Sequence, residues 1–226
     1  RHPKELADFK GEAVAVDAFN TLYQFLAIIR GPDGTPLKDS EGRVTSHLSG
    51  LLYRNTNFLE AGIRPAYVFD GEPPQLKIKT IEERRARREQ AEREYRDALA
   101  RGDLETARSK AQQTSRLEQP MIEEAKEVLA ALGIPVVQAP SEGEAQAAAM
   151  VQKGLAQKVA SQDYDSLLFG APSLVRNLAV SGRRKLPGRD AYVTVVPEVI
   201  DLEENLQALQ LTRTQLIDVG ILVGTD

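Results

Sequence analysis

The sequence predicts an α/β fold in which a mixed, largely parallel β-sheet is flanked by helices and carries a charged helical arch as an insertion. Two observations indicate this fold. Short apolar runs typical of buried strands alternate with stretches of helical periodicity, which is the pattern of a parallel sheet. Residues 76–118 then change character, because charged residues dominate there and apolar residues become scarce. We expect one domain over residues 1–226, with the insertion at about 76–118.

The first part of the chain supplies strand, helix and strand in turn. Its apolar runs are short enough for buried strands, and its leucines and phenylalanines recur at helical spacing. Glycines follow both helical stretches, as is typical of helix C-termini. The expected elements are a strand at 13–17 (AVAVD), a helix ending near Gly31, a turn-rich loop or hairpin at 32–43, a helix at 46–61 and a strand at 66–70 (AYVFD).

The second part begins with the charged insertion, which Gly102 and Asp103 break into two helical stretches. After it, the alternation of apolar runs and helical patterns resumes. The expected elements are a helix at about 120–132, a strand in PVVQAP, an alanine-rich helix after Ser141, a strand in KVASQD, edge strands or a hairpin formed by LVRNLAV and AYVTVVP around the basic turn SGRRKLPG, and a final helix in TRTQLIDVGILVG.

The composition excludes several classes of protein. There is no Cys, which excludes disulfides and thiolate metal sites. No apolar run approaches the roughly 18 residues of a membrane span, so we expect no membrane partner and a cytoplasmic protein, or a nuclear one in a eukaryote. The net charge of −4 argues only weakly against nucleic acid, because residues 77–101 hold nine Lys or Arg against six Asp or Glu.

Seven carboxylates share one relation to the predicted sheet, since each closes an apolar run or lies in the turn just after it. The carboxyl ends of parallel strands form the edge at which open α/β sheets bind ligands. So many acids at one edge repel one another unless cations lie between them, and oxygen ligands without Cys suit Mg²⁺ or Mn²⁺. The sequence therefore predicts a divalent metal site and phosphate chemistry. The seven are Asp17, Asp70, Glu142, Glu144, Asp163, Asp165 and Asp226.

Each of these acids also has a purely structural interpretation. Ser141 and Glu144 fit a capping box at the start of a helix. Asp165 fits an N-cap for a helix beginning at the next residue. Asp17 and Asp70 each fit a turn residue or an N-cap. The shared relation of all seven acids to the sheet favours the metal site, and a carboxylate can fill both roles.

Other metal-dependent classes fit less well. The pattern of Asp163 and Asp165 also occurs in Mn-dependent glycosyltransferases. A haloacid-dehalogenase phosphatase would carry a second aspartate at the position of Phe19. His2 and His47 are isolated in the sequence, and we interpret both as structural or surface residues rather than zinc ligands.

The charged insertion has two interpretations. Helices of mixed charge are usually solvated faces held by pairs four residues apart. Lys77 and Arg84 lie seven positions apart, so they can share one helix face and form a basic lid that grips a phosphodiester. Tyr23, in the first helix, fits either the core or a ring that stacks on a base.

Six motifs in this order resemble the flap endonuclease family, in particular the archaeal and eukaryotic flap endonuclease-1 type among the XPG-related 5′ nucleases. The resemblance runs from about Asp8 to Asp226 and implies a 5′ nuclease, PIN-like fold with a helical arch. It also implies a structure-specific 5′ flap endonuclease and 5′-3′ exonuclease that acts in DNA replication and repair. The motifs are AVDAFNTLYQFL, TSHLSGLLYR, YVFDGEPPQLK, GIPVVQAPSEGEAQAA, ASQDYDSLLFG and ILVGTD.

The resemblance implies roles for individual residues and two Mg²⁺ ions, for which Mn²⁺ can substitute. The first ion would be held by Asp17, Asp70, Glu142 and Glu144, and the second by Asp163, Asp165 and Asp226. Lys77 and Arg84 match arch residues that contact the scissile phosphate, and Tyr23 matches a residue that stacks on a nucleotide. Arg30 and Arg54 match positions near the bent duplex.

The sequence also departs from the family pattern. It opens Arg1-His2-Pro3 and stops at Asp226, which implies truncation at both ends, without the family's duplex-binding region and clamp-binding peptide. The expected partner is branched DNA with a 5′ flap, bound by a monomer, and a sliding clamp is expected only for a full-length member. Two alternatives are a PIN-like metal-dependent ribonuclease and a junction-binding fragment with little activity.

Overall fold

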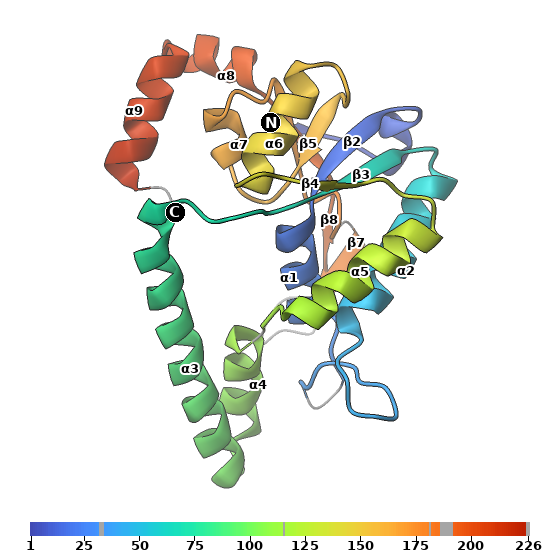
Figure 1. Cartoon of the computed structure of the whole chain (residues 1–226), viewed down its shortest axis with the longest axis vertical. Helices are drawn as coiled ribbons and strands as arrows, with labels where there is room; N and C mark the ends of the chain where they lie inside the picture. Colours follow the sequence, from blue (N-terminus) through green and yellow to red (C-terminus); the bar gives the residue numbers. More distant parts are fainter. Residues whose placement is uncertain (32–33, 115, 181, 186–191, 225–226) are drawn as a thin grey trace. The chain divides into compact units, whose positions relative to one another are not determined.

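The computed structural model describes residues 1–31, 34–114, 116–180, 182–185 and 192–224. Figure 1 shows how helices and strands follow one another along the chain. The chain divides into two compact units, and both are built from segments that are separated in the sequence. The first comprises Arg1–Thr21, Asn55–Glu72 and Ile134–Asp226, and the second comprises Leu22–Arg54 and Pro73–Gly133.

The first unit contains a seven-stranded sheet in the order β1-β9-β6-β5-β2-β3-β4. The strands from β6 to β4 are parallel, whereas β9 and β1 are antiparallel to their neighbours, so the predicted mixed, largely parallel sheet is confirmed. The strands are β1 (His2–Pro3), β2 (Ala13–Asp17), β3 (Arg64–Phe69), β4 (Val136–Gln138), β5 (Lys158–Ala160), β6 (Ser173–Arg176) and β9 (Glu198–Asp201).

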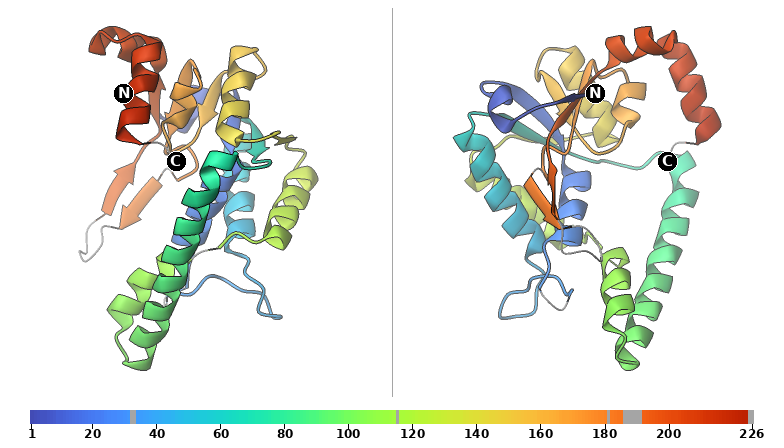
Figure 2. Two further views of the ribbon diagram at one scale, coloured as in Figure 1. Left: turned by 60° about the vertical axis from the view of Figure 1, so that its left-hand side comes forward. Right: turned by 180° about the vertical axis from the view of Figure 1, so that it is seen from behind.

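One strand prediction was wrong. LVRNLAV was expected to form an edge strand or part of a hairpin, but β6 lies inside the sheet, because β5 pairs with it on one side and β9 on the other. The hairpin is formed instead by β7 (Gly182–Lys185) and β8 (Tyr192–Val195), which make a separate two-stranded sheet (Figure 2). Residues 186–191 of the basic turn lie outside the described part of the chain.

The core of the first unit explains why β2 is an unbroken apolar run. Val14, Ala15 and Val16 are all buried, because β2 is covered on both faces. Helix α6 (Gly143–Gln152) packs against the sheet through Ala147 and Ala148, whose small side chains allow a close approach. The other helices of this unit are η1 (Leu6–Phe9), α7 (Asp165–Leu168), α8 (Leu202–Leu209) and α9 (Arg213–Val223).

The second unit contains the charged insertion, which forms two helices, as expected. The structure adds that these helices lie side by side (Figure 1). Buried alanines lie on both, including Ala98 on α3 and Ala107 on α4. The 23-residue α3 is highly charged, and no helix in the described ranges is both long and apolar enough to cross a membrane. The helices are η2 (Gln75–Lys77), α3 (Ile78–Ala100), α4 (Leu104–Gln113) and α5 (Gln119–Ala131), and α1 (Ala18–Ile28) and α2 (Ser46–Glu60) contribute residues to both units.

Gly50 lets α1 and α2 approach closely within the second unit. A Cβ at this position would lie 2.3 Å from Cγ of Phe25, which is itself buried. Helix propensity alone would make Gly50→Ala stabilising by about 1 kcal/mol. Overpacking against the phenyl ring opposes this gain and costs about 1–3 kcal/mol or more.

We therefore expect Gly50→Ala to lower the free energy of unfolding by up to about 2 kcal/mol, which is the overpacking cost less the propensity gain, measured by urea denaturation followed by circular dichroism. Ser49→Ala, one position earlier in the same helix, is the matched control and should change it by less than about 0.5 kcal/mol. A stabilised Gly50→Ala variant would contradict the packing of Phe25 on this glycine.

Candidate functional site

The parallel strands bring acids from distant parts of the sequence to one edge of the sheet. Asp17 ends β2, Asp70 directly follows β3, and Asp163 lies in the loop after β5. Because β5, β2 and β3 are neighbours and run parallel, these three strand ends lie side by side. Glu144 lies in the first turn of α6, and Asp165 is the first residue of α7. The predicted ligand Asp226 lies outside the described residues.

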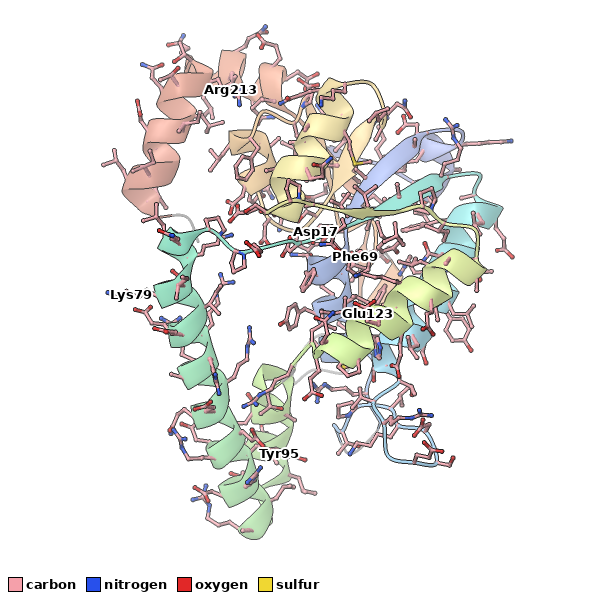
Figure 3. All side chains as sticks on the ribbon, in the orientation of Figure 1. Asp17, Phe69, Lys79, Tyr95, Glu123 and Arg213 are labelled. Carbon is pink, nitrogen blue, oxygen red and sulfur yellow. The ribbon has the colours of Figure 1, made fainter. Side chains whose placement is uncertain are left out.

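Asp17 is the buried member of this group. Its side chain is 6% exposed and lies where β2 passes into α1 (Figure 3). The pKa of Asp17 is raised from 3.8 to about 7. Burial is the largest cause and the negative charges of Asp70 and Asp163 add to it, while donors from Asn20 and Ser161 oppose the increase. The two neighbouring aspartates therefore act electrostatically on Asp17, and the edge is crowded with negative charge.

The Ser161 hydroxyl joins three of the acids. It lies 3.1 Å from Oδ2 of Asp17 and 3.3 Å from Oε1 of Glu144, and it accepts a hydrogen bond from the backbone N–H of Asp163 at 3.2 Å. A hydroxyl has one hydrogen, so Ser161 can donate to only one of the two carboxylates at a time. Asp17 and Glu144 therefore compete for one donor.

Asn20 makes a second link, between the ends of β2 and β5. Its backbone N–H donates to Oδ1 of Asp17 at 3.0 Å, and its side-chain amide donates to Oδ2 of Asp163 at 2.8 Å. Asn20 and Ser161 were not predicted from the sequence. Two signals could have found them, since Asn20 lies three residues after Asp17 at the start of a helix and Ser161 lies two residues before Asp163 at a strand end.

Two glycines let the loops after β3 and β4 approach each other. The backbone N–H of Gly143 donates to Oδ1 of Asp70 at 2.6 Å, and a Cβ on Gly143 would also lie 2.6 Å from that oxygen. A Cβ on Gly71 would lie 2.3 Å from the backbone oxygen of Ala139. Gly143, the single glycine of the motif SEGEA, is therefore needed to position the Asp70 carboxylate.

Two of the purely structural interpretations were wrong. Ser141 does not cap α6, because its hydroxyl donates to the backbone oxygen of Glu72 at 2.9 Å and Glu142 occupies the N-cap position. Asp165 does not precede its helix as an N-cap, because α7 begins at Asp165 itself and Tyr164 is the N-cap residue. The N-cap interpretation of Asp17 is confirmed, since it accepts from the N–H three residues later. Asp17 is therefore both the N-cap of α1 and the buried carboxylate of the acidic edge.

The acids fit a divalent cation in chemistry, although the described part of the chain holds no ready-made group of three His, Cys, Asp or Glu ligands. All the candidate donors are carboxylate oxygens, which hard cations such as Mg²⁺ prefer. The raised pKa of Asp17 shows that negative charge is disfavoured at this edge, and a bound cation would favour the ionised carboxylate. The hydrogen bonds from Ser161, Asn20 and Gly143 hold the carboxylates near one another.

The predicted DNA-contacting residues belong to the second unit. Arg88 of α3 lies over the ring of Tyr23, 5.5 Å from its centroid, so this ring takes part in a cation–π contact. Lys77 ends η2 and Arg84 is exposed on α3. Figure 3 shows this helix from Lys79 to Tyr95.

The two arginines of the predicted duplex contact are partly buried. Arg30 donates to the backbone oxygens of Leu26 and Gly34, at 3.0 and 2.8 Å, and burial lowers the pKa of its guanidinium. These hydrogen bonds join the C-terminal end of α1 to the loop that follows it. Arg54 lies on α2. A cavity of about 670 Å³ in this unit is bordered by Arg30, Tyr95 and Arg116, among others.

Comparison with known proteins identifies two matching domain families. The XPG N-terminal domain matches residues 2–91, and the XPG I-region matches residues 133–226. The flap endonuclease 1 of Pyrococcus furiosus is 60% identical over 222 residues, which cover 98% of this chain and 65% of that protein. The flap endonuclease 1 of Archaeoglobus fulgidus is 60% identical over 226 residues, which cover 100% of this chain and 67% of that protein.

Solved structures give the same picture. The flap endonuclease-1 from Methanococcus jannaschii matches with a TM-score of 0.73 at 44% identity, covering 100% of this chain and 68% of that one. The catalytic core of Rad2 in complex with a DNA substrate matches with a TM-score of 0.69 at 31% identity, covering 99% of this chain and 58% of that one. The chain spans about 65% of the length of several of the curated relatives that it matches.

The raised pKa of Asp17 predicts how the metal-free protein responds to pH. Its carboxyl binds a proton more tightly in the folded state than in the unfolded state, so the free energy of unfolding falls as pH rises from about 4 to about 7. Asp17→Asn cannot titrate. We expect it to be more stable than the wild type at pH 8 in EDTA, by on the order of 2–4 kcal/mol, with little difference at pH 4.

Urea denaturation across this pH range would measure the effect. Asp201→Asn, at a partly exposed helix cap of the same unit, controls for the loss of one negative charge. Parallel stability curves for the wild type and Asp17→Asn would show that Asp17 is not buried as described.

Gly143→Ala tests the seat of Asp70. The added methyl group forces this carboxylate to turn away, and we expect the affinity for Mg²⁺, measured by calorimetric titration, to fall by about tenfold or more. Gly154→Ala lies beyond the other end of α6, where a Cβ meets nothing within 4 Å, and its φ of +73° makes it mildly destabilising. This control should leave the affinity unchanged, and an equal loss in both variants would contradict the role given to Gly143.

Proposed function

Because this chain belongs to the flap endonuclease 1 family of XPG-related nucleases, we propose that it hydrolyses DNA phosphodiesters at single-strand/duplex junctions, as a 5′ flap endonuclease and 5′-3′ exonuclease. The observation that carries the proposal is the acidic edge of the sheet. Ser161 and Asn20 link Asp17, Glu144 and Asp163 there, and the charge of Asp70 acts on Asp17. Names and titles of the relatives support the same substrate class. Replication and repair are the processes in which such an activity acts.

We propose two Mg²⁺ ions at this edge, with Mn²⁺ as a substitute. Asp17, Asp70, Glu142 and Glu144 would hold one, and Asp163, Asp165 and Asp226 the other. When bound, two divalent ions activate a water and neutralise charge on the attacking and leaving oxygens of a phosphodiester. Nucleases of this family are generally dependent on divalent metal, which supports the coarser part of this assignment.

The chain's own residues prepare this edge. Ser161 and Asn20 keep the ends of β2 and β5 together, so the carboxylates need little rearrangement when they bind cations. Burial of Asp17 excludes water from one side of the group, which strengthens the electrostatic interactions there. Asp17 must lose its proton to become a ligand, so cation binding and proton release are coupled.

We propose that residues 76–118 form a basic arch for the single-stranded flap. Lys77 and Arg84 would contact the scissile phosphate and offset its growing negative charge. Tyr23 would stack on a nucleotide, and the cation–π partner Arg88 would then have to leave its ring. Arg30 and Arg54 would lie near the bent duplex, where Arg30 acts by holding the loop after α1.

Partners and location follow as further proposals. The chain would act as a monomer on branched DNA with a 5′ flap, in the cytoplasm or, in a eukaryote, in the nucleus. A sliding clamp is a further partner that we propose for the full-length family type.

Cleavage of a labelled 5′-flap DNA in Mg²⁺ tests the function. We expect cuts near the junction, no cleavage in EDTA, and a loss of at least about a hundredfold in Asp165→Ala, because a ligand position matters at least as much as the groups that support it. Binding of the same DNA in Ca²⁺ should change by no more than a few-fold in that variant.

Two outcomes would favour the alternatives. Faster cleavage of single-stranded RNA than of flap DNA would indicate a PIN-like ribonuclease. Tight binding of flap DNA without cleavage in either Mg²⁺ or Mn²⁺ would indicate a junction-binding fragment.

A further inference from the structure

Tyr164 lies between Asp163 and Asp165 and faces partly outward, with 39% of its surface exposed. Arg176, from β6, approaches it in two ways. The guanidinium carbon lies 4.6 Å from the centroid of the ring, and Nη1 donates to the phenolic oxygen at 2.5 Å. Arg1 makes a similar pair of contacts, with its guanidinium carbon 5.7 Å from the centroid and Nη2 donating to the same oxygen at 2.5 Å.

These contacts leave the Tyr164 hydroxyl available as a hydrogen-bond donor. A phenolic oxygen accepts through its lone pairs and donates one hydrogen, and both arginines use it as an acceptor. No acceptor for its hydrogen is found among the described residues. Two guanidiniums on one oxygen also polarise the O–H bond, which makes it a stronger donor toward an anion.

A hydrogen bond to the backbone fixes the position of Arg176, and its positive charge can still interact with an anion. Its Nε donates to the backbone oxygen of Gln162 at 3.0 Å, which fixes the guanidinium beside the loop after β5. Within the described ranges, no carboxylate oxygen lies within 4.0 Å of this guanidinium, whereas Arg1 has Glu198 at 3.8 Å. Arg176 therefore has no ion-pair partner among the described residues, and it lies beside a phenol that presents a donor.

We propose that Tyr164 and Arg176 form a binding site for a backbone phosphate of the DNA strand, next to the acidic edge and separate from the phosphate that is cut. The inference rests on the proposed function, because it assumes that a DNA strand reaches this edge. Tyr164 supplies a neutral O–H donor and Arg176 supplies charge, a combination that suits a phosphodiester oxygen. Neither residue is among the predicted ligands or DNA contacts.

Equilibrium binding of a fluorescent 5′-flap DNA to the whole chain, measured by anisotropy in Ca²⁺ over a series of KCl concentrations, tests the site. The integrity of the DNA is checked afterwards on a denaturing gel. Tyr164→Phe keeps the ring beneath Arg176 and removes only the O–H. We expect it to weaken binding about tenfold, the effect of losing one hydrogen bond to a charged group. The slope of log K against log salt should stay unchanged, because no charge is lost.

Arg176→Gln should weaken binding and also reduce the magnitude of that slope by about one, because one phosphate contact by a cation is lost. Arg176→Lys should restore the slope, although not the full affinity, because lysine keeps the charge without the planar fork. The matched control is Arg64→Gln. Arg64 is an exposed arginine at the start of β3, at the opposite end of the strand from Asp70, and it should leave both affinity and slope unchanged.

A second readout separates contact from positioning. With saturating DNA and Mg²⁺, the single-turnover cleavage rate of Tyr164→Phe should stay within about twofold of the wild type. Unchanged affinity in Tyr164→Phe would overturn the proposed site, and so would a fall in the single-turnover rate alone, which would indicate that Tyr164 only positions Asp163 and Asp165. Both results leave flap cleavage by the wild type intact, whereas failure of the wild type to bind or cut flap DNA would overturn the proposed function itself.

Discussion

Repulsion between carboxylates is the interaction around which the acidic edge is built. A parallel sheet places the ends of β5, β2 and β3 together, and each of these ends contributes an aspartate. Hydrogen-bond donors offset part of this repulsion. They include the hydroxyl of Ser161, the amide groups of Asn20 and the N–H of Gly143. The pKa of Asp17 nevertheless stays raised, first because the carboxyl is buried and then because the charges of Asp70 and Asp163 act on it. A site with this imbalance favours cations.

The fold and the acids could be predicted because both follow from local patterns. Buried parallel strands leave unbroken apolar runs such as AVAVD and AYVFD, and an acid that closes such a run must lie at the sheet edge. The two helices of the charged insertion were also predictable, since Gly102 and Asp103 interrupt an otherwise helical pattern. The direction and order of the strands then bring the acids together without further information.

Other features could not be predicted, because they depend on contacts between distant segments. Ser141 matches a capping box in sequence, yet its hydroxyl donates to the backbone oxygen of Glu72. This contact depends on the pairing of β3 with β4, which brings the loops after these two strands together. LVRNLAV resembles an edge strand, but β9, which comes later in the chain, pairs with the side of β6 that would otherwise be an edge. Asn20 and Ser161 are ordinary polar residues until the sheet forms. Their role depends on which carboxylates arrive beside them.

The interleaving of the two units has a consequence for synthesis on the ribosome. The chain leaves the first unit after Thr21, returns at Asn55, leaves again after Glu72 and returns at Ile134. Strand β2 therefore emerges early, but its second neighbour β5 and the loop with Asp163 are translated only after the whole of the second unit's sequence. Until then a nascent chain exposes unpaired strand edges, which makes chaperone protection valuable. It also lacks Asp163 and Asp165, so the acidic edge is completed only after β5 and the loop that follows it have been translated.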